Sequence, residues 1–400
     1  MSSNRKTVVG VIFGGRSVEH DVSVVTGNQV MRAFDTDRYE VVPIYIDRNG
    51  KWFTGKPLME LKNFNDEVTG LPGVEDAILS PSINHHGLII NPIAGRFSKS
   101  AIKRLDVVFP AVHGTHGEDG TLQGLLELAD IPYVGCGVMA SAIANDKIMT
   151  KAVLQQSGIP VVDSVHFSRI AWRDDPDAII KQLEASLTYP MFIKPATTGS
   201  SIGIGYAPDE TLLRASIDIA THFDRNILVE GAVADSVEIN CAVMGNDDDI
   251  RASVLEQPVS WQDFLTYEEK YLRGNEGMKS ADRIIPAPLT DELTEQIRQT
   301  AIDSFKAIDG RGTARVDLLV KPDENVFYVN EINTMPGSLA FYLWQEEGLS
   351  SAETVEQLVQ LAQDAHAIKR QSTYNYQTNL IAQTAARGLK GAKGRKSVTN

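Results

Sequence analysis

The sequence predicts an α/β and α+β protein of three domains. Its 400 residues are enough for two or three domains at about 150 residues each. The beginning of the chain follows the order strand, glycine turn, helix, strand, which is a βαβ unit. Later strand-like runs gather in two further groups. We therefore place the domains at residues 1–138, 139–232 and 233–370, followed by a basic tail at 371–400.

The first domain is predicted to be an open α/β domain. Residues 8–13 form a continuous apolar run, as expected for a parallel strand that is buried on both faces. A glycine turn ends this run, and a helical pattern at 19–34 leads to a second strand at 41–46. Residues 54–100 are rich in Gly, Pro and Asn, so we expect a loop-rich insertion there, with a strand at 106–109 after it.

Two smaller α+β domains are predicted in the rest of the chain. A helix at 145–157 ends where Gly158 and Pro160 stop it. The elements expected after it are strands at 191–194, 202–206 and 227–230 with a helix at 212–222, then strands at 239–244, 315–320 and 326–331 with helices at 293–307 and 352–366. The polar stretch 260–280 is typical of a lid or of a mobile surface loop, and the basic tail is expected to be disordered.

Composition excludes several classes of protein. The hydrophobic content of 42% and charged content of 22% are ordinary for a globular chain, so disorder and fibres are excluded. The net charge of -14 argues against nucleic acid and against an anionic membrane as partners. No apolar run approaches the ~20 residues that membrane insertion needs. Cys136 and Cys241 are far apart and match no metal or redox spacing, so we expect a reducing, cytoplasmic location.

A lysine followed by a glycine-rich turn is the first candidate site. Lys194 ends a predicted strand, and the small residues of 195–205 follow it. Such a turn can aim successive backbone N–H groups at phosphate oxygens, because small residues let the backbone come close. The segment is neither a Walker loop nor a dinucleotide fingerprint, and an ordinary β-hairpin explains the same residues equally well.

Two predicted strands carry acidic and amide side chains at spacings of two. Arg315 and Asp317 share one face of their strand, and Glu331 and Asn333 share one face of the next. Hard oxygen donors with few histidines nearby suit Mg²⁺ that bridges phosphates, rather than zinc. The alternative is a solvated strand pair with one salt bridge. The apolar neighbours of Asp317 argue against solvation.

Two further turns concentrate polar residues. His113 begins a glycine-rich turn that also holds a second histidine and two acids, directly after a predicted strand. Open α/β sheets bind ligands at such positions, although a lone histidine is more often structural. Glu19 lies at the first strand-to-helix turn, where a helix-capping role is favoured over the binding of a substrate ammonium group.

Taken in order, these motifs resemble the D-alanine–D-alanine ligase family. The segments that carry the resemblance are Gly14-Gly15-Arg-Ser-Val-Glu19, His113 to Gly124, Asn145-Asp146-Lys147, Lys194-Pro195, Gly199-Ser200-Ser201-Ile-Gly203, Lys270-Tyr271, Arg315-Val-Asp317 and Glu331-Ile-Asn333-Thr-Met-Pro-Gly337. The match runs from about residue 7 to residue 365. The family belongs to the ATP-grasp superfamily. The resemblance therefore implies a Rossmann-like N-terminal domain followed by a two-domain ATP-grasp fold.

The resemblance also implies roles for individual residues. Catalytic roles fall to Glu19, Ser200, Tyr271, Arg315 and Gly337, and substrate binding to His113, Lys270, Ser338 and Leu339. ATP would be bound by Lys147, Lys194, Gly199, Ser201, Glu230, Val233 and Glu238. Two Mg²⁺ ions, with Mn²⁺ as an alternative, would be held by Asp317, Glu331 and Asn333. The resemblance further implies a homodimer in the cytoplasm.

The implied reaction is the ATP-dependent ligation of two D-alanines to D-alanyl-D-alanine, for peptidoglycan precursor synthesis. The first carboxylate takes the γ-phosphoryl group of ATP as an acyl phosphate, and the second amine then displaces phosphate. D-Serine, D-lactate or another amino acid as second substrate is an alternative, although Tyr271 disfavours D-lactate. A non-catalytic nucleotide-binding protein is a further alternative. The chain departs from the family pattern where Gly337 and Ser338 are contiguous, and residues 230–238 are one residue longer than usual.

Overall fold

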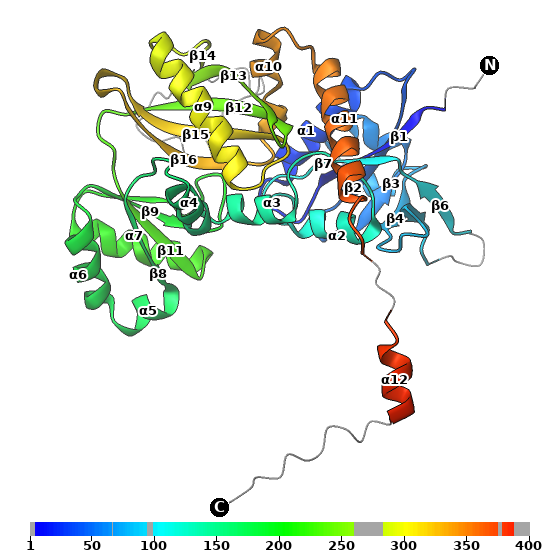
Figure 1. Ribbon diagram of the computed structural model, residues 1–400, viewed down its shortest axis with the longest axis horizontal. Coiled ribbons are helices and arrows are strands. Elements are labelled where there is room, and N and C mark those ends of the chain that lie inside the picture. The colour runs from blue at the N-terminus through cyan, green and yellow to red at the C-terminus, as the bar shows by residue number, and fades with distance from the viewer. Residues whose placement is uncertain (1–4, 66, 94–98, 260–282, 375–377, 388–400) are drawn as a thin grey trace, which may run out of the picture.

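The structure is a computed structural model that describes residues 5–65, 67–93, 99–259, 283–374 and 378–387. It contains three β-sheets, of seven, four and five strands, which follow one another along the chain. Figure 1 shows the first sheet in blue and cyan, the second in green and the third in colours from light green to orange. The predicted combination of α/β and α+β architecture is confirmed.

The first sheet has the strand order β6-β5-β4-β3-β2-β1-β7. Its strands are β1 (Thr7–Gly14), β2 (Tyr39–Ile46), β3 (Trp52–Thr54), β4 (Glu75–Leu79), β5 (Gly87–Ile90), β6 (Ala101–Arg104) and β7 (Val107–Ala111). As predicted, β1 and β2 are parallel neighbours. The loop-rich insertion predicted at 54–100 also contains two strands that were not predicted, β4 and β5, which pair with each other, and β5 pairs with β6 directly after the insertion. Strands of four or five residues are too short to give a clear periodic signal.

Helices cover both faces of this sheet. The helices are α1 (His20–Ala33) and α2 (Thr121–Ala129), together with α11 (Ser351–Lys369) from the far end of the chain. Phe13 packs with residues of α1 and α11, whereas Ile12 packs with residues of α2, as the alternation of a strand requires. The C-terminal segment thus returns to the first domain. Three short 3₁₀ helices, η1 (Lys56–Met59), η2 (Leu61–Asn65) and η3 (Val68–Gly70), lie beside it.

The second sheet has the order β10-β9-β11-β8. The elements of this region are α3 (Val138–Asn145), α4 (Lys147–Gln156), β8 (Ser164–Ser168), α5 (Arg169–Asp174), α6 (Pro176–Ser186), β9 (Met191–Pro195), β10 (Gly205–Ala207), α7 (Glu210–Phe223) and β11 (Asn226–Gly231). The helix predicted at 145–157 begins at Lys147, because Asp146 caps it through hydrogen bonds from the N–H groups of Ile148 and Met149. The cap fixes the position of Lys147 as the first residue of α4.

The third sheet has the order β14-β13-β12-β15-β16. The elements are β12 (Val237–Asn246), β13 (Asp249–Pro258), β14 (Arg283–Ile284), α9 (Asp291–Ala307), β15 (Gly312–Lys321), η5 (Pro322–Glu324), β16 (Val326–Asn333), η6 (Gly337–Ala340) and α10 (Phe341–Glu346). Val316 and Leu318 point to one face, where they pack with residues of α9. Arg315 and Asp317 alternate with them and therefore lie on the other face.

The end of the described chain forms α12 (Leu380–Arg387), which Figure 1 shows away from the three sheets. The expectation of a disordered tail at 371–400 stays a prediction, within which the structure describes this one helix. Leu380 and Ile381 on this helix are exposed. Among the described residues, no helix has both the length and the apolar character that crossing a membrane requires.

Candidate active site

A cavity lies where the three parts of the chain meet. Its lining comes from α4 and the turn after β9 on one side, and from β16 on the other. Lys147, Gly199, Glu331 and Asn333 are among the lining residues that the sequence predicted to act, and Glu118 closes the cavity from the first domain. The structure therefore brings predicted phosphate-binding and metal-binding residues to one place.

A buried carboxylate on the second sheet holds two lysines. Glu230 on β11 contacts Lys194 at 2.5 Å and Lys151 at 2.8 Å. Burial alone would raise the pKa of Glu230, but the two ammonium groups outweigh burial and lower it to about 2. Burial lowers the pKa of Lys151, and Glu230 opposes that change. Lys194 also donates to Oδ1 of Asn330 at 3.0 Å, which ties the second sheet to the third.

The glycine-rich turn crosses over this cavity. Lys147 on α4 donates to the carbonyl oxygen of Thr198 at 2.9 Å, so the lysine fixes the turn. Burial lowers the pKa of Lys147, while Glu331 favours its charged form. Ser200 and Ser201 in the turn adopt positive φ angles of 52° and 58°. Because β9 and β10 pair antiparallel, the segment is a hairpin, and its loop lies beside the cavity.

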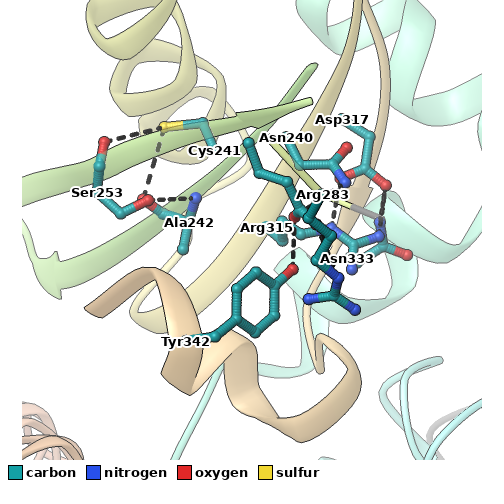
Figure 2. Close-up of polar contacts among 10 residues, drawn as sticks. Asn240, Cys241, Ala242, Ser253, Arg283, Arg315, Asp317, Asn333 and Tyr342 are labelled. Atoms are coloured by element: carbon teal, nitrogen blue, oxygen red, sulfur yellow. Dashed lines mark hydrogen bonds and ion pairs between the residues drawn. The ribbon is translucent and has the colours of Figure 1, made fainter. Parts of the chain in front are cut away.

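The acidic and basic side chains of β15 and β16 form a compact group (Figure 2). Both Nε and a terminal nitrogen of Arg315 donate to Asp317 at 2.6 Å, and Asn333 donates to Asp317 at 2.8 Å. Burial raises the pKa of Asp317 to about 7 although Arg315 opposes the rise. Burial also works against the charge on Arg315, but the attraction of Asp317 outweighs it and raises the arginine pKa well above its ordinary value.

The donor set fits a divalent ion that is shared with phosphates. Glu331 lies directly opposite Asp317 in the strand register, and Asn333 lies opposite Arg315. In the part of the chain that the structure describes, no three His, Cys, Asp or Glu side chains gather closely enough to bind a metal alone. Mg²⁺ commonly takes one or two carboxylates and completes its shell with water and substrate phosphate oxygens. Two carboxylates and one amide oxygen match that pattern.

A second polar group lies at the first strand-to-helix turn. Glu19 is buried, and the Ser200 hydroxyl donates to its carboxylate across the boundary between the first and second domains. His113 is also buried, and its Nε2 lies 2.9 Å from the Thr26 hydroxyl. Glu118 faces His113, and burial together with the neighbouring Glu19 raises the pKa of Glu118. Glu19 and Ser200, which were predicted to act together, are in contact.

The remaining predicted residues are placed as follows. Ser338 and Leu339 lie in η6 directly after Gly337, and the Leu339 side chain is fully buried in the core. Glu238 is exposed near the beginning of β12, and the carbonyl oxygen of Val233 accepts from Ser236 in the preceding turn. Lys270, Tyr271 and the predicted lid at 260–280 lie outside the described residues.

The sequence analysis missed two residues of this region, Lys151 and Asn330. Lys151 follows Lys147 by four positions on α4, so helical spacing could have indicated that both lie on one face. Asn330 is the extra residue of a β-bulge, since Glu331 pairs with Asp317 whereas Val329 pairs with Leu318. Bulges redirect side chains locally, and nothing in the sequence marks this one.

Comparisons with known proteins cover most of the chain. Residues 8–136 match the family model described as "D-ala D-ala ligase N-terminus", and residues 153–360 match "D-ala D-ala ligase C-terminus". A D-alanine–D-alanine ligase of Acetivibrio thermocellus is 39% identical over 89% of this chain and 96% of its own length. One of Geobacillus thermodenitrificans is 39% identical over 93% of this chain and 100% of its own length.

Solved structures of ligases that use D-alanine are also similar to this chain. The VanG D-Ala:D-Ser ligase from Enterococcus faecalis aligns with a TM-score of 0.77 and 31% identity, over 90% of this chain and 100% of that one. The D-alanine–D-alanine ligase from Coxiella burnetii aligns with a TM-score of 0.76 and 30% identity, over 96% of this chain and 99% of that one. The similarity therefore extends across all three sheets.

Proposed function

The chain belongs to the D-alanine–D-alanine ligase family of ATP-dependent ATP-grasp ligases, and from this premise we propose how its own residues join two D-alanines. The observation that carries the proposal is one cavity that Lys147 and Gly199 line from one side and Glu331 and Asn333 from the other, beside a glycine-rich turn whose Ser200 donates to Glu19 of the first domain. The dipeptide serves peptidoglycan synthesis.

The second and third sheets hold ATP in this proposal. Lys147 and Lys194 bind its phosphate oxygens, and the turn at 198–201 covers them with backbone N–H groups. Glu230 acts on Lys194, because their ion pair keeps the ammonium group charged and directed. We place the nucleoside near Val233 and Glu238, beyond the end of β11.

Asp317, Glu331 and Asn333 would hold two Mg²⁺ ions, or Mn²⁺ in their place. When bound, the ions neutralise charge on the phosphates. Arg315 lies beside these ligands and offers a fixed guanidinium to the oxygen on which negative charge develops. We place the Gly337 N–H at the same oxygen.

Glu19 binds the ammonium group of the first D-alanine in this proposal. Its carboxylate is buried and fixed by Ser200, so it is a preformed anionic partner for a small cation. His113 lies behind this site, where its contacts to Thr26 and Glu118 fix the ring. We propose that Tyr271 and Lys270 complete the site over the substrates and that Ser338 and Leu339 border the second amino acid.

The direct test is ATP-dependent phosphate release with D-alanine alone and with D-alanine paired with D-serine, D-lactate or L-alanine, with products identified by mass. D-Alanyl-D-alanine as the main product is expected. The D-serine arm matters because one similar solved structure is a D-Ala:D-Ser ligase. Phosphate release without any D-alanyl product would contradict the proposed reaction.

We propose that the chain forms a homodimer and that it acts in the cytoplasm. ATP is a cytoplasmic substrate, and both cysteines, Cys136 and Cys241, are free and buried, as in a reducing compartment. Light scattering of the purified chain would report the mass of the assembly directly.

Replacing Glu230 with Gln should destabilise the protein most at neutral pH. The folded-state pKa of Glu230 is lowered to about 2 from 4.5, so its contribution is present above the unfolded pKa and is lost as pH falls toward 2. The loss at about pH 7 should be about 3 kcal/mol, because the substitution also leaves two lysines buried without a counter-charge.

Denaturant unfolding of both proteins across a pH series measures this difference. Glu210→Gln is a matched control, because Glu210 forms an exposed ion pair with Arg214 at 2.8 Å and should contribute less than about 1 kcal/mol. A Glu230→Gln difference that stays constant from neutral to acidic pH would contradict the assignment.

A further inference from the structure

One face of the third sheet carries a row of polar residues that is longer than the proposed metal site. The strand register aligns Glu256 with Asn240, Asn240 with Asp317, and Asp317 with Glu331. Neighbouring strands are about 4.8 Å apart, so Glu256 lies roughly 10 Å from Asp317 across the sheet. The Glu256 end of the row therefore lies on the same sheet face as Asp317, two strands away from it.

Glu256 is the centre of a buried polar group at that end, whose other members Arg283 and Tyr342 are labelled in Figure 2. It is only 2% exposed, and its carboxylate accepts a hydrogen bond from the Tyr342 hydroxyl at 2.5 Å. Arg283 forms an ion pair with Glu256 through Nε at 3.2 Å, and its guanidinium lies 4.1 Å from the centre of the Tyr342 ring. The arginine is thus held on two sides, by a carboxylate and by an aromatic face.

Arg283 lies on the same sheet face as the proposed chemistry. It pairs with Pro258 on β13, two residues from Glu256, so both side chains lie on that face. The ion pair with Glu256 uses Nε, and a guanidinium carries four further N–H donors on its terminal nitrogens. With 25% of its side chain exposed, Arg283 is accessible from outside the protein core.

A strained turn in the backbone positions Tyr342 beside Glu256. Ser338, Leu339 and Ala340 have φ angles of 48°, 52° and 50°, which L-residues other than glycine rarely adopt in succession. Leu339 and Ala340 are fully buried, so packing holds the turn in place. Tyr342 follows two residues after Ala340, in the first turn of α10. Backbone strain that is retained by packing is common at ligand sites.

Arg315 connects this group with the reacting centre. Figure 2 shows Tyr342 and Arg283 beside Arg315. Burial raises the pKa of Tyr342 and Arg315 opposes the rise, so the tyrosine remains a neutral donor near that cation. An amino acid whose amine reacts beside Arg315 carries its carboxylate only a few ångströms away, and Tyr342 with Arg283 forms a polar group that lies next to Arg315.

We propose that Arg283, held by Glu256 and Tyr342, binds the carboxylate of the second amino acid and is a specificity-determining residue of the ligation. This inference rests on the proposed function. Ser338 can offer only a hydroxyl and a backbone N–H in the shortened segment after Gly337, whereas a guanidinium offers charge and a planar pair of donors that match a carboxylate.

The test compares wild type with Arg283→Met, using D-alanine and D-alaninamide as second substrates. D-Alaninamide keeps the reacting amine of D-alanine but lacks the negative charge of its carboxylate. Arg283→Met should raise the KM for the second D-alanine by about tenfold or more. It should change the KM values for ATP and for the first D-alanine less than about twofold. The preference for D-alanine over D-alaninamide should fall by a similar factor, a change that loss of folding cannot produce.

Three further variants make the result decisive. Arg283→Lys keeps the charge and should recover part of the preference. Arg283→Met combined with Glu256→Gln removes the buried charge that the single variant leaves unpaired, and should show the same lost preference. Arg298→Met is a control on the opposite face of the sheet, where Arg298 donates to the Ala252 carbonyl oxygen at 2.8 Å, and its preference should match wild type.

Two outcomes distinguish a failure of the inference about Arg283 from a failure of the proposed function. If wild type forms D-alanyl-D-alanine but the Arg283 variants lose activity equally with both second substrates, or keep their preference, the inference about Arg283 is wrong and the proposed function stands. If wild type forms no D-alanyl product, the proposed function itself fails.

Discussion

Replacing Glu331 with Gln is expected to reduce ligation by at least about a thousandfold. Glu331 lies opposite Asp317 in the strand register, and both line the face that we assign to ATP and its metal ions. The amide keeps the size of the side chain but loses the charge that a divalent ion requires. Charge on the transferred phosphoryl group would then lose most of its compensation, which is where phosphoryl-transfer enzymes gain their rate.

Two measurements check this prediction. The first is turnover at saturating D-alanine and ATP over a titration of Mg²⁺. The second is ATP affinity as a function of Mg²⁺ concentration, measured by calorimetry without D-alanine, which should weaken in the variant. Glu324→Gln is a control on η5, where Glu324 forms a surface ion pair with Lys321, and it should leave both measurements unchanged. A Glu331→Gln enzyme with wild-type turnover would refute the metal assignment.

The fold could be predicted where single elements are long and uniformly apolar. The strand at 8–13 and the helix at 19–34 were expected within one or two residues of β1 and α1, because burial on both faces of a parallel strand leaves a continuous apolar run. β13 was not predicted. Arg251, Ser253 and Glu256 interrupt its apolar pattern, and their positions make sense only beside β12 and the buried polar row.

The site could be predicted where one motif carries the chemistry within a few residues. Arg315 with Asp317, and Glu331 with Asn333, were expected on shared strand faces, and the register places the two pairs opposite each other. Lys194 was expected at a strand end, and it lies there. The buried group around Glu256 could not be predicted, since Glu256, Arg283 and Tyr342 are far apart in the chain and only strand pairing and a left-handed turn bring them together.

Replacing Arg315 with Met is expected to lower kcat by about 10² to 10³-fold, a loss comparable to removing a donor that stabilises developing negative charge. Arg315 is fixed before substrate arrives, because two of its nitrogens donate to Asp317 at 2.6 Å. Its pKa is raised well above the ordinary value, so it stays charged at every pH at which the protein is folded. A fixed, permanently charged guanidinium stabilises charge that appears only during the reaction.

The loss should fall on kcat more than on the KM values for ATP and D-alanine, because the charge that Arg315 meets is small before the reaction begins. Arg315→Met also leaves Asp317 buried without its counter-charge and should cost about 3–5 kcal/mol of stability, so thermal unfolding must be measured in parallel. Arg315→Lys keeps the charge without the paired geometry, and should be more stable than Arg315→Met yet remain slow. If Arg315→Lys were fully active, a point charge would suffice, and the fixed orientation that Asp317 imposes would contribute nothing to the reaction.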